Sequence, residues 1–208
     1  MTDATEGITD DLFAGTAWHY ARYRPDYPRR FFDDLVRRLR LDGTGRLLDL
    51  GCGTGQLTVP LARHVSEAVG MDPEPTMLVE AARRAEAAGL ANVTWVRGGS
   101  EDLPGGLGRF RLVTIGQADR GRRPGVARRD TGAILLPCVH RLVHEFERAW
   151  TIEQAIGYLY STSLPLHRLL GDRRAAFEQT ITENLLAIDP GGCFVEPVTL
   201  EVLIAAES

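Results

Sequence analysis

Residues 45–56 read GRLLDLGCGTGQ and decide the fold. A short apolar run leads into three glycines, Gly51, Gly53 and Gly55, which is typical of a strand buried on both faces and followed by a sharp turn. In open α/β sheets, ligands bind beyond the carboxyl ends of the strands, where a following helix points free N–H groups at them. The sequence therefore predicts a ligand-binding turn at residues 51–55.

Downstream of this turn, helical and strand patterns alternate. An alanine-rich amphipathic pattern predicts a helix over 75–89 that ends at Gly89. A helix over 57–67 tolerates Pro60 only near its first turn. Strands are expected at residues 45–51, 67–72, 92–98 and 110–118. This order predicts a Rossmann-like α/β fold with a doubly wound, mostly parallel sheet.

The two ends of the chain extend this pattern. Apolar residues recur at helical spacing in RRFFDDLVRRLR, residues 29–40. Beyond residue 118, we expect strands at 132–139 and 143–151, helices at 152–162 and 172–188, and an antiparallel closing strand at 194–206. No repeat or linker divides the chain, so we expect residues 1–208 to form a single domain.

Composition narrows the function classes. The 208 residues carry a net charge of -4, with a pI of about 5.8, whereas nucleic-acid-binding domains are usually basic; we expect no nucleic-acid partner. All 24 basic residues are arginine, which excludes a lysine Schiff base. The 3 separated cysteines predict neither a disulfide framework nor a metal site. No apolar stretch approaches the roughly 18 residues of a membrane span, so we expect no membrane association and a cytoplasmic location.

The glycine spacing separates two classes of cofactor. Nicotinamide and flavin sites use GxGxxG, but here the run is GxGxG and Gln56 follows it, so a nicotinamide oxidoreductase is the weaker alternative. The run DLGCGTG, residues 49–55, instead resembles the first motif of the class I S-adenosylmethionine-dependent methyltransferases. The resemblance covers residues 18–118 and implies S-adenosyl-L-methionine as the cofactor.

The resemblance also implies which residues bind the cofactor. The first motif contributes Asp49, Gly51, Gly53 and Gly55. At the end of the second strand, Asp72 would accept hydrogen bonds from both ribose hydroxyls, and Met77 would pack on the adenine. The upstream segment YARYRPDYP resembles one found in small-molecule methyltransferases of this type. From this segment, Tyr20 and Arg24 would reach the cofactor's carboxylate.

Two further segments complete the implied site. In SEDLP, after the third strand, Ser100, Glu101 or, as our first choice, Asp102 would meet the adenine amino group. At the end of the fourth strand, Gln117 would lie near the methionine part of the cofactor. Glu101 and Asp102 could also form only a solvated turn.

Structural roles are open alternatives for several of these residues. Asp72 could simply cap the following helix, and Met77 could be an ordinary core residue. Arg120 to Arg129 contains five arginines without an interleaved aromatic residue, which favours a solvated loop over a nucleic-acid grip. His140 and His144 would share one face of a helix, as in a metal pair, but no third ligand is apparent.

Methyl transfer mainly requires alignment of the acceptor, so no dedicated catalytic residue is obligatory. A hydroxyl acceptor would benefit from a general base, for which His19 is a candidate, with Tyr158 or Tyr160 as hydrogen-bonding alternatives. We therefore expect a methyltransferase that acts on oxygen, nitrogen or carbon of a small molecule, as in natural-product biosynthesis.

The chain departs from the family it resembles after the fourth strand. The N-terminal helical segment (1–45), the cofactor-binding core (46–118) and the C-terminal strand and helix part (140–208) fit the family, but residues 119–139 form an atypical, shortened region. The acceptor site would then be completed by residues 158–167 or by a partner subunit, as in a homodimer. The alternative is a cofactor-binding protein that does not methylate and serves as a scaffold, a regulator or a catalyst of another reaction.

Overall fold

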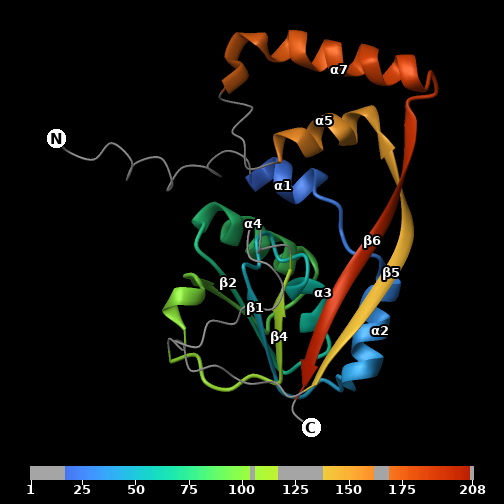
Figure 1. The fold of residues 1–208 in the computed structure, drawn as a ribbon. Coiled ribbons are helices and arrows are strands. Elements are labelled where there is room, and N and C mark those ends of the chain that lie inside the picture. Colours follow the sequence, from blue (N-terminus) through green and yellow to red (C-terminus); the bar gives the residue numbers. More distant parts are fainter. Residues whose placement is uncertain (1–16, 104–105, 117–137, 162–168, 207–208) are drawn as a thin grey trace, which may run out of the picture.

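A computed structural model describes residues 17–103, 106–116, 138–161 and 169–206 (Figure 1). The helices are α1 (Ala17–Tyr23), α2 (Arg29–Leu39), α3 (Thr58–Ala62), α4 (Pro75–Ala87), α5 (Ile152–Tyr160) and α7 (Arg174–Ile188), with 3₁₀ turns η1 (Ser100–Asp102) and η2 (Gly171–Arg173). The strands are β1 (Arg46–Leu50), β2 (Glu67–Asp72), β3 (Val93–Arg97), β4 (Leu112–Ile115), β5 (Cys138–Thr151) and β6 (Cys193–Ala206).

Four of the strands form one parallel sheet in the order β3-β2-β1-β4, which confirms the predicted α/β class. In this sheet, Leu48 of β1 lies opposite Val69 of β2 and Val113 of β4. β1 and β2 are buried along most of their length, as their continuous apolar sequences predict. All four carboxyl ends therefore point the same way, and the glycine turn leaves the sheet from its centre.

The two faces of the sheet are covered differently. On one face, Leu47 packs in a core cluster with Leu35 of α2 and Leu61 of α3. On the other face, Leu48 clusters with Val69 and Met71, and the partly buried side chains that cover them come from the segment after η1 and from the strands. The amphipathic α2 joins the core because its apolar residues fall on one side of the helix.

The strands β5 and β6 form a separate two-stranded antiparallel sheet (Figure 1). Residues 143–151 and 194–206 are strands, as expected, and their antiparallel pairing runs over all of β5 and β6. Within the described residues this second sheet does not extend the parallel sheet, and β4 pairs only with β1. Most of the strand expected at 132–139 lies outside the described residues.

Two element boundaries differ clearly from the expected ones. The helix expected over 57–67 ends at Ala62, because the chain must turn before β2 starts at Glu67 in register with Arg46. In that turn, the Ser66 N–H donates to the Gly45 carbonyl at 2.9 Å. The helix expected over 172–188 begins at Arg174, after η2. Among the described residues, no helix combines the length and the hydropathy that a membrane-spanning segment needs.

Helices from the two ends of the chain lie next to each other. Figure 1 shows α1 beneath α5, with α7 on the outer side of α5. Tyr23 of α1 donates a hydrogen bond to Glu153 of α5 at 2.9 Å. At Gly157 of α5, an added Cβ would lie 2.3 Å from the Tyr23 ring, so glycine permits this close approach. The N-terminal segment is thereby placed between the carboxyl ends of the parallel strands and the C-terminal helices.

Candidate functional site

The turn after β1 has a backbone that only glycine adopts readily. Gly51, Gly53 and Gly55 have φ values of 65°, 52° and 77°, in the left-handed region. A Cβ at Gly55 would also lie 3.1 Å from both Trp95 and Val59. The Cys52 N–H donates to the Met71 carbonyl at 3.0 Å, so the turn is anchored to the end of β2.

Asp72 connects this turn to the end of β2. Its Oδ2 accepts a hydrogen bond from the Gly53 N–H, and its Oδ1 accepts one from the Glu74 N–H, both at 2.9 Å. The N-cap of α4 is Glu74, whose side chain accepts from the Thr76 N–H, so Asp72 is not the helix cap. Burial raises the pKa of the Asp72 carboxyl, whereas the two backbone donors lower it. Asp72 therefore lies where a carboxylate can contact both the turn and a ligand above it.

Asp49 lies beneath the turn and not at its surface. Only 1% of the residue is exposed, and its carboxylate accepts hydrogen bonds from the hydroxyls of Thr58 at 2.5 Å and Thr114 at 2.7 Å. Burial raises the pKa of the Asp49 carboxyl to about 6, and the two hydroxyls oppose that shift. Asp49 thus ties β1 to α3 and β4, which supports a role in shaping the turn.

Tyr20 and Arg24 reach the glycine turn from the N-terminal side. The Tyr20 ring lies 3.6 Å from the position of a Cβ on Gly53. The Arg24 guanidinium, on a residue that is 8% exposed, lies 5.2 Å from the centre of the Tyr20 ring and 5.1 Å from that of Tyr158. Gln56 donates hydrogen bonds from Nε2 to the carbonyls of Arg24 and Pro25 at 3.2 and 3.3 Å. The structure therefore brings Tyr20, Arg24 and the turn together.

The residues expected near an adenine lie beside Asp72. Ser100, Glu101 and Asp102 form η1, and the Asp102 carboxylate accepts a hydrogen bond from the Gly99 N–H at 2.8 Å. The neighbouring Gly98 N–H donates to the Asp72 carbonyl at 3.1 Å, which places η1 at the same edge of the sheet.

Two other residues of the expected site have different positions. Met77, in α4, is only 4% exposed, so most of its side chain is covered in this conformation. Gln117 lies outside the described residues. At the preceding Gly116, an added Cβ would lie 2.5 Å from the Leu57 side chain and 3.0 Å from the Tyr27 hydroxyl.

The two candidate catalytic residues, His19 and Tyr158, have different aromatic neighbours. The His19 ring is 5.4 Å from that of Tyr160, whose hydroxyl donates to Glu178 of α7 at 2.9 Å. Tyr158 lies against Arg24, and its ring centre is 5.2 Å from that of Trp150. Tyr158 is therefore linked to the glycine turn through Arg24.

The histidine pair considered for a metal lies in a strand. His140 and His144 are both in β5, where a rise of about 3.3 Å per residue separates them by roughly 13 Å, too far to share one ion. His144 contacts Phe31, with ring centres 5.5 Å apart. No group of three possible metal ligands occurs in the part of the chain that the structure describes.

Trp95 is a site-supporting residue that the sequence analysis did not identify. Its ring covers Gly70 of β2, where a Cβ would lie 2.4 Å from the ring, and it contacts Gly55. A glycine inside a strand pattern often marks such a close approach, so Gly70 was an available signal. The same region buries Cys52 and raises the pKa of its thiol, consistent with a packing role.

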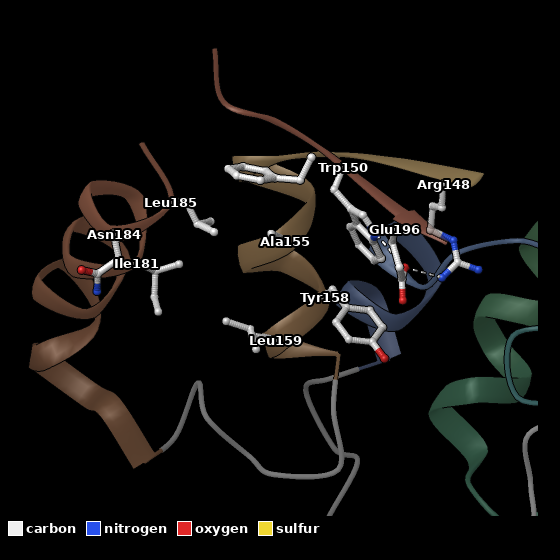
Figure 2. Close-up of a pocket in the computed structure, with 10 residues that line it drawn as sticks. Arg148, Trp150, Ala155, Tyr158, Leu159, Ile181, Asn184, Leu185 and Glu196 are labelled. Carbon is white, nitrogen blue, oxygen red and sulfur yellow. Dashed lines mark hydrogen bonds and ion pairs between the residues drawn. The ribbon is translucent and has the colours of Figure 1, made fainter. Parts of the chain in front are cut away.

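A cavity of about 540 Å³ lies next to α5 and is named here the α5–α7 cavity (Figure 2). It is lined by Arg148, Trp150, Ala155, Tyr158, Leu159, Ile181, Asn184, Leu185, Phe194 and Glu196. Sequence reasoning identified only Tyr158 among these, because the others come from three distant segments whose proximity no local pattern indicates.

Known proteins resemble part of the chain. A family model described as a methyltransferase domain matches residues 47–123. A ubiquinone biosynthesis O-methyltransferase of Azorhizobium caulinodans is 35% identical over 128 residues, which are 58% of this chain and 50% of that protein. A demethylmenaquinone methyltransferase of Geobacillus kaustophilus is 34% identical over 87 residues, 40% of this chain and 37% of that protein.

An RNA-modifying enzyme is also similar. The 23S rRNA (uracil(1939)-C(5))-methyltransferase of Shewanella woodyi is 30% identical over 87 residues, 42% of this chain and 20% of that protein. The chain thus spans half or less of the length of these relatives. The matched segment contains the glycine turn, Asp72 and η1. Residues 47–123 therefore match a methyltransferase domain, and the glycine turn, Asp72 and η1 within them agree with the resemblance to the class I S-adenosylmethionine-dependent methyltransferases.

Proposed function

We propose that this protein is an enzyme that transfers a methyl group from S-adenosyl-L-methionine to a small molecule. The observation that carries the proposal is the hydrogen bond between the Gly53 N–H and the Asp72 carboxylate, across a turn of three left-handed glycines. This arrangement exposes backbone without side chains next to a fixed carboxylate. Exposed backbone suits an amino-acid tail and a carboxylate suits ribose hydroxyls, and this cofactor contains both groups.

The residues present fit S-adenosylmethionine. When bound, the cofactor supplies a methyl group on a positively charged sulfur. The turn at Gly51–Gly55 would hold the amino-acid part, and Asp72 the ribose hydroxyls. Tyr20 and Arg24, next to the turn, would face the cofactor's carboxylate, and a guanidinium suits that anion. At the other end of the site, η1 would meet the adenine, with Asp102 as the acceptor for its amino group, and Met77 would pack on the ring.

A small molecule is the better candidate for the acceptor. One of the similar proteins is named for ubiquinone biosynthesis, one for demethylmenaquinone and one for 23S rRNA. Net charge favours a small molecule over RNA, because a chain of charge -4 lacks the overall basic character that RNA binding usually needs. In the part of the chain that the structure describes, arginines such as Arg84, Arg111 and Arg141 form ion pairs with carboxylates, which offset their positive charge. We propose methylation of oxygen, nitrogen or carbon on such a molecule, as in natural-product biosynthesis.

A second candidate is a protein that binds the cofactor but does not methylate. It is favoured by the atypical region at 119–139 and by β4, which within the described residues pairs only with β1. Such a protein would act as a scaffold or a regulator, or would catalyse a different reaction.

One experiment separates these candidates. Calorimetry would first measure binding of S-adenosylmethionine and S-adenosylhomocysteine, and a coupled assay would then follow formation of S-adenosylhomocysteine with a panel of phenols, amines and activated carbon acids. Binding with turnover on any acceptor supports the enzyme. Tight binding with no turnover across the panel supports the scaffold, and no binding of either nucleoside rejects both.

A further inference from the structure

The α5–α7 cavity has one apolar wall built from two helices. Ala155 and Leu159 of α5 and Ile181 and Leu185 of α7 line it, and Figure 2 shows the α7 residues on the opposite side from Trp150 and Tyr158. Its volume of about 540 Å³ falls in the range of small-molecule sites, which are mostly apolar with a few polar groups that orient the ligand.

The opposite end of the cavity is aromatic and polar. Glu196 Oε2 accepts hydrogen bonds from Trp150 Nε1 at 2.8 Å and from the Arg148 guanidinium at 3.2 Å. The ion pair with Arg148 makes this end neutral overall, so it favours an uncharged ligand. A carboxylate can accept about four hydrogen bonds, and Glu196 therefore retains capacity for a ligand hydroxyl or amine.

The same end offers ring surfaces to a flat ligand. The rings of Trp150 and Tyr158 meet at 70°, with their centres 5.2 Å apart, so each presents a differently oriented face or edge. Phe194 adds a third ring to the lining. Offset-stacked and edge-to-face contacts of this kind favour an aromatic ligand over a saturated one of equal size.

One wall of the cavity is shared with the glycine turn. Tyr158 lines the cavity and contacts the Arg24 guanidinium, which lies between the rings of Tyr158 and Tyr20. Tyr20 in turn lies against Gly53. Figure 2 shows Tyr158 and Glu196 on the side of the cavity that faces α1. Tyr158, Arg24 and Tyr20 thus link the lining of the cavity to the glycine turn.

We propose that the α5–α7 cavity binds the methyl acceptor, and that this acceptor is an uncharged, flat aromatic molecule with a hydroxyl or amino group directed at Glu196. The inference rests on the proposed methyl transfer, for which it names the class of substrate. It assigns a binding function to β5, β6 and α7.

The test uses 2-naphthol as the probe, because it is flat and apolar and has one hydroxyl group. Calorimetry would measure its binding to the full chain with S-adenosylhomocysteine present, and the binding of S-adenosylhomocysteine alone. Ala155→Trp fills the cavity and should weaken 2-naphthol binding by about tenfold or more. Ala176→Trp, at an exposed position on α7, is the matched control and should leave 2-naphthol affinity unchanged. Both variants should retain wild-type affinity for S-adenosylhomocysteine.

The outcomes separate the inference from the proposed function. Equal 2-naphthol affinity in the wild type and Ala155→Trp, or no 2-naphthol binding by a protein that binds S-adenosylhomocysteine, overturns the inference alone. No binding of S-adenosylhomocysteine by the wild type overturns the proposed function and the acceptor role with it. If Ala155→Trp does not fold, Ile181→Arg provides a second block from α7, with the same expected loss. If the wild type instead binds an oligouridine, and Ala155→Trp or Ile181→Arg abolishes that binding, the cavity binds RNA and the small aromatic acceptor is overturned.

Discussion

The carboxylate of Asp72 accepts a hydrogen bond from the backbone N–H of Gly53 at 2.9 Å, and this bond joins the turn after β1 to the end of β2. The carboxylate also accepts a hydrogen bond from the Glu74 N–H, so both of its oxygens are held in place. A preorganised acceptor of this kind lowers the cost of ordering the site when a ligand binds.

Asp72→Ala should weaken binding of S-adenosylmethionine by roughly 1.5 to 3 kcal/mol, about 10- to 150-fold, the usual scale for hydrogen bonds to a charged group. Calorimetry measures the dissociation constant, and circular dichroism checks that the variant is folded. Asp26→Ala, which removes an exposed carboxylate paired with Arg84, is the control. A dissociation constant that does not change in Asp72→Ala would remove Asp72 from the cofactor site.

Gly55→Ala should destabilise the protein more than Gly89→Ala. Both glycines have positive φ, 77° and 68°, so both substitutions carry a backbone cost of roughly 1 to 2 kcal/mol. Only at Gly55 would the added Cβ also press on Trp95 and Val59, whereas nothing lies within 4 Å at Gly89. Urea denaturation measures both free energies of unfolding, and equal losses would contradict the packing assigned to Trp95.

The stability of the protein should fall as the pH rises from about 4 to about 6. The pKa of Asp49 is raised from 3.8 to about 6 by burial, so the folded state favours the protonated carboxyl. This contribution is fully present below the unfolded-state pKa and is lost as the pH rises through the folded-state pKa. Its size is up to about 3 kcal/mol for a shift of this extent. Asp49→Asn should flatten that part of the pH profile of unfolding free energy, and an unchanged profile would contradict the assignment.

Tyr158→Ala should weaken binding of S-adenosylmethionine, whereas Tyr158→Phe should preserve it. The ring of Tyr158 holds one side of the Arg24 guanidinium, and a cation–π contact of this kind contributes about 0.5 to 2 kcal/mol. Phenylalanine keeps the ring and removes only the hydroxyl. Calorimetry would compare the two variants, and kcat of Tyr158→Phe would show separately whether the hydroxyl takes part in methyl transfer. Equal affinities in the two variants would show that the ring does not position Arg24.

The parallel sheet could be predicted from the sequence because its strands are short and apolar and alternate with helical patterns. The positions of Asp72 and η1 followed from their places after the second and third strands, since carboxyl ends of parallel strands meet at one edge. The burial of Asp49 was not predicted, because a motif residue carries no local sign of whether it faces a ligand or the core. Its two hydroxyl partners, Thr58 and Thr114, come from other elements.

The second sheet and the α5–α7 cavity depend on long-range pairing. The sequence predicted that residues 194–206 close the parallel sheet as an antiparallel strand, whereas β6 pairs with β5 in a separate sheet. Trp150 is opposite Phe194 and Glu196 is opposite Arg148, so Trp150 and Glu196 lie diagonally across the two strands. This register brings the indole N–H to the carboxylate. Neither residue has a sequence motif, so the cavity could be found only in three dimensions.

The placement of Arg24 between Tyr20 and Tyr158 also has a consequence for how the protein is made. During translation, the glycine turn and Asp72 leave the ribosome early, but the second aromatic face for Arg24 arrives only with α5. A nascent chain that stops before α5 would have the parallel strands without a completed binding site. If Arg24 requires both rings, the proposed cofactor site is therefore complete only after α5 has been synthesised.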